Sequence, residues 1–334
     1  MGFTAFTAFT IFTAFAAFTT FTIFTTFTAF PMTSADTQHH KRALRGIGLI
    51  MAAVFMFSAM DTLAKYMLKS YPMSALMWAR YVVHVVVMLA WLGPRMGMRL
   101  IYTAHPWKQI LRGVLLVGST TFFYFALRYL PLAEAAAITF VGPVLTALLS
   151  GPMLGDKVTR RQWFAVIIGF TGVLIIMRPG GGVLSLPAVF PLATAILFSV
   201  YQIVTRKVAG RDHPYTSLFY TAIVGGAITS FAVPFHWITP TLSQAGFVVC
   251  IGLLGGFGHL LLIRAMEHTS PSTLAPFVYS QLIWSTLLAY LVFGDFPEPM
   301  TLFGMFVVVA AGLLAVNWQH MRRLADADDQ TGTH

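Results

Sequence analysis

The stretch that decides the fold is Leu127–Pro143, LRYLPLAEAAAITFVGP, which continues directly into VLTALLSGPMLGDKVTRR. It is a long apolar run that contains one carboxylate, Glu134, and a proline, Pro143. About twenty consecutive apolar residues span the hydrocarbon core of a bilayer as a helix. A proline inside such a helix removes a backbone hydrogen bond and kinks it. This stretch therefore predicts a kinked transmembrane helix with an acid just inside it.

The composition places the whole chain in the membrane. Hydrophobic residues make up 57% of the 334 positions and charged residues 10%, whereas about 25% of the residues in a soluble domain are charged. The single cysteine, Cys250, excludes an internal disulfide and a cysteine-based metal cluster. Because there is no Walker sequence and no metal-ligand spacing, we expect neither an ATP-driven pump nor a metal or other cofactor.

Residues 1–43 precede the first apolar span and begin with a low-complexity segment. Phe recurs at every third position from Phe3 to Phe30, a period that matches neither helix nor strand. No Lys or Arg precedes the run, which argues against a signal peptide. Residues 1–31 are interpreted either as a repeat read from an upstream start codon, with Met32 as the true start, or as an extra membrane-associated segment.

Ten apolar stretches of about twenty residues follow, each long enough to cross a bilayer. Turn residues or charges separate them, as at Leu130-Pro131 and Asp156-Lys157. The expected spans are residues 46–66, 73–93, 110–129, 131–152, 160–178, 184–205, 214–235, 243–264, 271–293 and 299–318. The remaining residues, 321–334, are expected to form a solvated tail.

The distribution of Lys and Arg predicts the orientation. With the amino terminus in the cytoplasm, sixteen basic residues outside the spans or at their ends, Arg112 among them, fall on the inner side. The outer side then has four, namely Lys65, Lys69, Arg128 and Arg178. This positive-inside bias places both termini in the cytoplasm and predicts a multi-pass protein of the bacterial inner membrane. The excess of Lys and Arg over Asp and Glu thus reflects membrane topology, and no nucleic-acid partner is expected.

The chain contains an internal duplication. The segment from Ala126 parallels the segment from Ala265 at a constant offset of 139 residues. In this pairing Leu148, Leu149, Gly155 and Asp156 match Leu287, Leu288, Gly294 and Asp295. Since each half has five spans, the second copy is inserted upside down relative to the first, as in alternating-access transporters. We expect an all-α integral membrane protein of ten transmembrane helices, with one five-helix repeat in residues 44–180 and its inverted copy in residues 181–320.

A known family resembles these segments. The EamA domain of the drug/metabolite transporter superfamily is similar to ALRYLPLAEAAAITFVGPVLTALLSGPMLGDKVTRRQWFAVIIGFTGVLIIMRPG, and its second copy to GHLLLIRAMEHTSPSTLAPFVYSQLIWSTLLAYLVFGDFPEPMTLFG. The resemblance covers roughly residues 44–318 and implies the ten-helix inverted fold and carriage of small metabolites. The stretches MWARYVVH and APFVYSQLIW are most similar to bacterial members described as riboflavin or S-adenosylmethionine uptake carriers. Asp156 and Asp295 stand where the family often has Glu, which keeps the carboxylate on a shorter arm.

The candidates for an intramembrane charge or coupling role are Asp61, Arg80, His84 and Glu134, because charges inside spans are rare and usually functional. Asp61, Arg80 and Glu134 all fall toward the outer side by rise per residue, and we expect Glu134 to lie near Arg80, with Asp61 competing for it. This cluster is either an ion pair that fixes helix packing or a contact for substrate or protons; an anionic substrate would favour Arg80. His84 shares the face of Arg80 one turn further on.

Polar and aromatic residues on the spans that the resembling family uses for its central pocket are the cavity candidates. They suit a flat, partly apolar ligand, although Tyr and Trp also form interfacial belts. The candidates are Thr120, Tyr124, Thr139, Tyr201, Gln202, His259, Tyr279, Gln281 and Trp284. His84 and His259 are either proton relays or histidines bonded to neighbouring helices. Pro143 and Pro276 are expected to be paired gating kinks, and Gly169, Gly172 and the pair Gly252 and Gly256 to permit close helix packing.

Together these features predict a non-enzymatic secondary transporter that moves a riboflavin-like, S-adenosylmethionine-like or amino-acid-like metabolite by alternating access. Its expected partners are the substrate, the lipid bilayer, protons or a counter-substrate, and a second copy in a homodimer. An exporter of the same fold is the alternative. An integral membrane enzyme would show clustered acids or histidines at one interface, and a scaffold would need longer loops to hold an output domain.

Overall fold

The computed structural model describes residues 36–154, 160–177, 186–208, 211–235, 237–268, 274, 277–278 and 280–311. Within these ranges every regular element is a helix and no strand occurs. The longer helices are α2 (Asp36–Met67), α3 (Met73–Met96), α4 (Pro106–Tyr129), α5 (Leu132–Thr139), α6 (Gly142–Leu154), α7 (Arg160–Met177), α8 (Val189–Val208), α9 (Pro214–Ser230), α10 (Leu242–His268) and α12 (Ser280–Phe293). An apolar helix over Pro299–Ala311 follows, and the short 3-10 turns are η1 (Gly97–Leu100), η2 (Leu186–Ala188) and η3 (Val233–Phe235).

Six of these helices are long and apolar enough to cross a membrane, and four shorter apolar helices accompany them. Lipid cannot hydrogen-bond the backbone, so an apolar chain satisfies its peptide groups internally as helices. Prolines begin several of them, with Pro106 and Pro214 in the first turn of α4 and α9, where no intrahelical N–H is needed. Each of the ten apolar stretches expected from the sequence contains helix in its described part.

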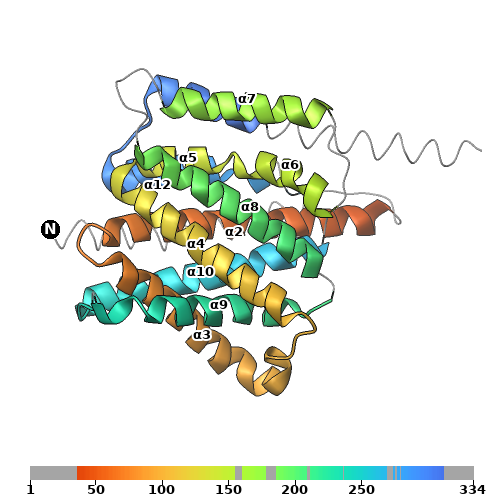
Figure 1. The fold of residues 1–334 in the computed structure, drawn as a ribbon, viewed down its shortest axis with the longest axis vertical. Coiled ribbons are helices and arrows are strands. Elements are labelled where there is room, and N and C mark those ends of the chain that lie inside the picture. The colour runs from red at the N-terminus through yellow and green to blue at the C-terminus, as the bar shows by residue number, and fades with distance from the viewer. Residues whose placement is uncertain are drawn as a thin grey trace, which may run out of the picture.

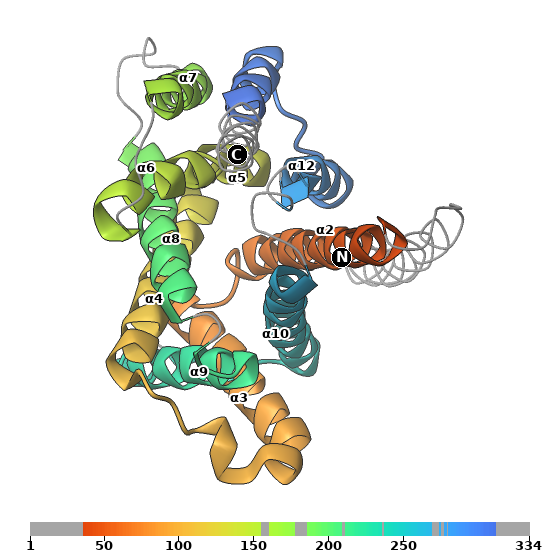
Figure 2. The ribbon, with the colours of Figure 1, turned by 90° about the vertical axis from the view of Figure 1, so that its right-hand side faces the viewer.

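The helices pack in a layered bundle, in which α2, α7 and α9 run nearly parallel to one another and α3, α4 and α8 cross them obliquely (Figure 1). α2 lies along α10, and α4 lies along α8; α3 contacts both α9 and α10, while α9 also contacts α4. Figure 2 looks along the bundle, with α4 and α8 on one side and α2 and α10 on the other. The apolar side chains left outside include Trp163, Phe164, Ile167 and Phe170 of α7, as expected of a surface that faces lipid.

The fourth expected span is divided into two helices, α5 and α6. Phe140 and Val141 separate them, and the Phe140 N–H donates to the carbonyls of both Ala136 and Ala137. Pro143, in the first turn of α6, has no N–H to donate, so the α-helical ladder cannot continue through it. The Ser199 hydroxyl of α8 donates to the Gly142 carbonyl at 2.9 Å. The proline thus coincides with a break, which is sharper than a kink, and its part in gating remains a prediction.

Glycines set how closely several helices approach. A Cβ atom on Gly172 of α7 would lie 2.9 Å from Val308 Cγ2 and 3.0 Å from the Gly304 carbonyl oxygen. On α10, a Cβ on Gly252 would lie 2.6 Å from Val83 Cβ. Since real Cβ contacts are longer, the helices are close because side chains are absent here. The close-packing role predicted for Gly172 and Gly252 is consistent with these approaches.

Candidate functional site

Charged and aromatic polar side chains gather in the interior between α2, α3 and α4. Asp61, Arg80 and Tyr124 expose 8%, 6% and 0% of their surface. The charge of Asp61 and the hydroxyls of Tyr81 and Tyr124 act on the Arg80 guanidinium, which lies 5.4 Å from the centroid of the Tyr81 ring. Such groups are costly in a membrane bundle, so their concentration marks a candidate functional site.

The Arg80 side chain has room because α10 presents glycine to it. A Cβ atom on Gly255 would lie 3.3 Å from Arg80 Nε and 3.0 Å from Met60 Sδ. A Cβ on Gly256 would lie 3.2 Å from His84 Nε2. The glycines of GLLGGFGH therefore make space for Arg80 and His84 on the facing helix.

Polar contacts continue from Arg80 across the bundle to α8. The Tyr81 hydroxyl donates to Thr120 Oγ1 at 3.5 Å and lies within electrostatic reach of Tyr201. Tyr201 in turn accepts a hydrogen bond from Arg112 Nη2 at 3.4 Å. Arg80, Tyr81, Thr120, Tyr201 and Arg112 thus form a sequence of neighbouring polar groups. We call the series from Asp61 to Arg112 the polar chain.

Beyond Arg112 the polar chain connects to the loops at one end of the bundle. Arg112 Nη1 donates to Gln109 Oε1 at 2.6 Å, and Gln109 Nε2 donates to Asp212 Oδ2 at 2.8 Å. Asp212 also accepts hydrogen bonds from the Thr103 hydroxyl and the Ala104 N–H. Partial burial works against the Asp212 carboxylate, but these hydrogen bonds outweigh it and hold the pKa of the group below its ordinary value of 3.8.

Replacing Asp212 with asparagine is expected to lower the melting temperature of the purified protein at neutral pH. The loss should correspond to roughly 1 kcal/mol, because hydrogen bonds to a charged acceptor become hydrogen bonds to a neutral one. A lowered pKa means that the carboxylate stabilises the fold fully above pH 3.8 and loses this effect as the pH falls through the lowered pKa.

The measurement is a set of melting curves between pH 3 and pH 7, with Arg211→Gln, an adjacent exposed charge, as the control. The difference between Asp212→Asn and the wild type should shrink toward the acid end. A difference that stays constant over the whole pH range would contradict this role for the carboxylate.

The two buried histidines lie on facing helices, α3 and α10. His84 and His259 are each 8% exposed, and His259 lies within electrostatic reach of Arg80, His84 and Arg112. Its ring meets that of Phe57 edge-on, with centroids 4.9 Å apart. In the part of the chain that the structure describes, His84 Nε2 has no hydrogen-bond partner. Both imidazoles are therefore beside the polar chain.

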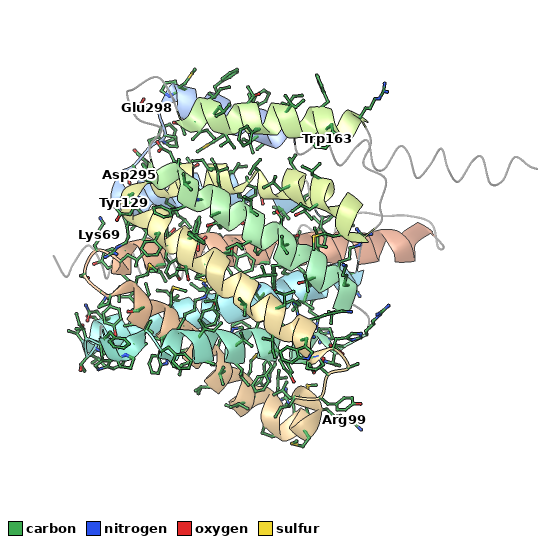
Figure 3. The ribbon with its side chains drawn as sticks, viewed as in Figure 1. Lys69, Arg99, Tyr129, Trp163, Asp295 and Glu298 are labelled. Carbon is green, nitrogen blue, oxygen red and sulfur yellow. The ribbon has the colours of Figure 1, made fainter. Side chains whose placement is uncertain are left out.

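An ion pair lies at the end of the bundle that is opposite to Asp212. Lys65 Nζ at the end of α2 lies 3.6 Å from Asp295 Oδ2 and donates to the Leu130 carbonyl at 3.1 Å. It also lies 5.2 Å from the Phe293 ring centroid. Figure 3 shows Lys69 and Asp295 at this end, whereas Arg99 lies at the other. Lys65 thus joins α2, α12 and the α4–α5 link.

Reversing the charge at Asp295 is expected to open the seam between α2 and α12. Asp295→Lys places a second positive charge beside Lys65, and the two lysine side chains repel each other. Two turns deeper in the seam, the buried Ser58 hydroxyl contacts that of Ser285 at 3.1 Å. A cysteine placed at Ser58 in a chain whose native Cys250 is replaced by alanine should therefore react severalfold faster with a membrane-impermeant thiol reagent.

The control is the double exchange Lys65→Asp with Asp295→Lys, which restores opposite charges and should return the labelling rate toward that of the parent. Equal labelling of the reporter in all three backgrounds would show that the ion pair does not hold the seam closed.

The remaining predicted site residues lie outside the polar chain. Glu134 is half-buried and acts electrostatically on Lys65, whereas Asp61 acts on Arg80. The expected proximity of Glu134 to Arg80 remains a prediction. The Thr139 hydroxyl bonds the carbonyl four residues before it, that of Ala135.

Three further candidates belong to α8 and α12. Trp284 packs edge-on against Phe55, with ring centroids 5.1 Å apart. Gln202 and Gln281 are half-buried, and the Gln281 carbonyl accepts a hydrogen bond from Ser58. A place for these three in a pocket remains a prediction. Tyr279 and Pro276 lie outside the described residues.

Sequence reasoning missed Arg112, Tyr81 and Gln109. Arg112 was counted among the cytoplasmic charges, yet α4 begins at Pro106 and buries it to 1% exposure. The signal that could have found it is the spacing from Gln109, since residues three apart lie on the same face of a helix.

A helical membrane bundle with buried charges between its helices is an arrangement expected of a membrane carrier. The sequence profile of the EamA-like transporter family matches residues 44–178 and 186–317. The chain therefore belongs to this family and is a multi-pass membrane transporter of small metabolites. The resemblance noted in the sequence is confirmed.

Relatives with assigned functions are similar over most of their length. An S-adenosylmethionine uptake transporter of Rickettsia bellii is 27% identical to this chain, over an alignment that covers 81% of this chain and 93% of the relative. A riboflavin transporter of Vibrio cholerae is 25% identical over 84% and 95%, and a pseudopaline exporter of Pseudomonas aeruginosa is 25% identical over 80% and 94%. A crystal structure with 20% identity covers 85% of this chain and 99% of its own with a TM-score of 0.60, which indicates a shared fold.

Proposed function

We propose that this chain is a secondary transporter that moves an S-adenosylmethionine-like or riboflavin-like metabolite by alternating access. The observation that carries the proposal is the polar chain from Asp61 to Arg112, which runs between helices that are otherwise apolar. Ionisable residues inside a membrane bundle mark substrate and ion pathways. The protein would perform no covalent chemistry.

The packing supports two inverted five-helix repeats. If α2 to α7 form one repeat and the helices from α8 to Ala311 the other, the pair α2 and α10 corresponds to the pair α8 and α4, and both pairs are in contact. The pair α3 and α10 corresponds in the same way to α9 and α4, which also touch. The contacts thus agree with a two-fold exchange of the halves, which is the arrangement of inverted-repeat transporters that work by alternating access.

The aromatic side chains support a ligand with a flat ring system. Tyr81, Tyr124 and Tyr201 are all buried and carry hydroxyls beside the two arginines. Such side chains stack on a ring through their faces and orient it through hydrogen bonds. S-adenosylmethionine has a purine and riboflavin an isoalloxazine, and both compounds are named for relatives of this chain.

The charge distribution supports an inner-membrane protein with both termini in the cytoplasm. Arg99 and Lys69 lie at opposite ends of the bundle (Figure 3), and the excess of basic residues falls on the Arg99 side. On this orientation the Lys65–Asp295 pair closes the outer side.

Coupling to protons would use His84, His259 and Glu134, because imidazole and carboxyl side chains inside a membrane bundle are the groups that proton relays are built from. Exchange against a second solute is the alternative to proton coupling. Assembly as a homodimer is compatible with either. A pH gradient imposed on proteoliposomes separates proton coupling from exchange, since uptake by a pure exchanger does not respond to it.

The test of transport is counterflow in proteoliposomes loaded with unlabelled S-adenosylmethionine or riboflavin. Labelled compound outside should accumulate transiently in vesicles that contain the protein, and should not in protein-free vesicles. If neither compound nor a panel of amino acids shows counterflow, the proposed substrate class is wrong.

Export is the second candidate, and the similarity to a pseudopaline exporter favours it. Both directions use the same alternating-access cycle, so the coupling gradient decides between them. Vesicles of known sidedness, energised by a proton gradient of either sign, should accumulate substrate in only one configuration.

A further inference from the structure

Arg112 is a buried cation whose three hydrogen-bond acceptors are all neutral. It is 1% exposed, and its Nε donates to Thr205 Oγ1 at 2.8 Å. Nη1 donates to Gln109 Oε1 at 2.6 Å and Nη2 to Tyr201 Oη at 3.4 Å. Among the residues that the structure describes, none of the groups that accept a hydrogen bond from Arg112 is a carboxylate.

The nearest acid along these contacts, Asp212, is separated from Arg112 by the Gln109 amide. Gln109 accepts from Arg112 through Oε1 and donates to Asp212 through Nε2. The Asp212 oxygens are already engaged by Thr103 and Ala104. A guanidinium has five N–H donors, and three are engaged in the described structure, which leaves one on each terminal nitrogen.

The buried ionisable groups near Arg112 are a second guanidinium, one acid and two imidazoles. His259 lies within electrostatic reach of Arg112, Arg80 and His84, and Asp61 acts on Arg80. The Tyr201 ring lies 5.3 Å from the Arg112 guanidinium and covers it. Two guanidiniums therefore share the described interior with one buried acid, and a buried charge without a counter-charge is strongly disfavoured.

We propose that Arg112, with Tyr201 and Thr205, forms a subsite for the oxyanion of the cargo, a carboxylate or a phosphate. The inference rests on the proposed transport function and specifies its substrate class as organic anions or zwitterions with a flat ring. The planar fork of arginine binds an oxyanion through two parallel hydrogen bonds, and these bonds are strong where water is excluded. The Tyr201 hydroxyl supplies a further donor beside the fork.

The test compares two matched pairs of ligands on purified full-length protein in detergent micelles. S-adenosylmethionine is paired with decarboxylated S-adenosylmethionine, and riboflavin 5′-phosphate with riboflavin. The first pair differs by a carboxylate and the second by a phosphate, so the two pairs distinguish the two oxyanions. The dissociation constant of each compound is measured by calorimetry, with thermal shift as a second readout.

The anionic member of at least one pair should bind the wild-type protein at least tenfold more tightly than its partner. Arg112→Gln should reduce this ratio to near one, whereas Arg99→Gln, an exposed arginine on the same side, should leave it unchanged. Arg112→Lys keeps the charge but lacks the fork, so it should retain a reduced preference. Tyr201→Phe removes one hydroxyl and should weaken anion binding without disturbing the fold.

Equal binding of both members of each pair by the wild-type protein would overturn the oxyanion subsite, and this comparison needs no variant to fold. A preference that survives in well-folded Arg112→Gln would overturn the assignment to Arg112. Counterflow separates the subsite from the transport proposal. A carrier that moves both members equally keeps its transport function and loses the subsite, while a protein that binds the anion but moves nothing keeps the subsite and loses the transport function.

Discussion

Replacing Arg80 with glutamine is expected to abolish transport and to destabilise the protein by about 1–3 kcal/mol, the cost of leaving buried polar groups without their partner. The side chain is 6% exposed and interacts with Asp61, Tyr81 and Tyr124 on three helices. Glutamine removes the cation, so Asp61 is left as a buried acid without its counter-charge. The measurements are counterflow in proteoliposomes and the melting temperature of the purified variant.

The double variant Arg80→Gln with Asp61→Asn separates the structural role of Arg80 from its role in transport. It removes both charges, so most of the stability should return, because a buried pair replaced as a whole costs little. Transport should remain at background if Arg80 contacts the substrate. Recovery of both stability and transport in the double variant would show that the pair only holds the helices together.

Substituting Gly225 with alanine is expected to cost roughly 1–3 kcal/mol of stability through overpacking and to slow transport strongly. The added Cβ atom would overlap the Tyr81 ring, with Cε1 only 2.5 Å away. Tyr81 cannot move aside freely, because its hydroxyl bonds Thr120 and its ring lies beside Arg80. The ring shift would therefore disturb the polar chain directly.

The adjacent Gly226 is a matched control. A Cβ atom there would meet nothing within 4 Å, and alanine favours a helix over glycine by about 1 kcal/mol. Gly226→Ala should thus leave transport unchanged and keep or raise the melting temperature. The comparison needs melting curves and initial transport rates for both variants. Similar losses in the two would mean that α9 resists any added side chain, and that the contact with Tyr81 is not the cause.

The helices could be predicted from the sequence because lipid leaves an apolar chain few alternatives. Apolar runs of about twenty residues located each stretch, and each of the ten contains helix in its described part. The burial of Asp61 and Arg80 was also predictable, since charges near the middle of an apolar run have no route to water.

The partners of the charges were harder to predict. Whether Asp61 or Glu134 acts on Arg80 depends on the rotation of α2 and α5 about their axes, which the linear pattern does not define. Arg112 was misjudged because a basic residue near the end of a span looks the same whether it reaches water or turns inward. Only the packing of α4 against α8, with Thr205 and Tyr201 as acceptors, distinguishes the two.

The buried acid and both buried arginines, Asp61, Arg80 and Arg112, lie within the first of the two segments that match the family. If this half moves as a body, one acid and two guanidiniums move with it, so a surplus of one positive charge is displaced within the electric field of the membrane. A full crossing of the field is worth about 2.3 kcal/mol per charge for each 100 mV. The return of the empty carrier would therefore respond to voltage, and a bound anion would cancel that response.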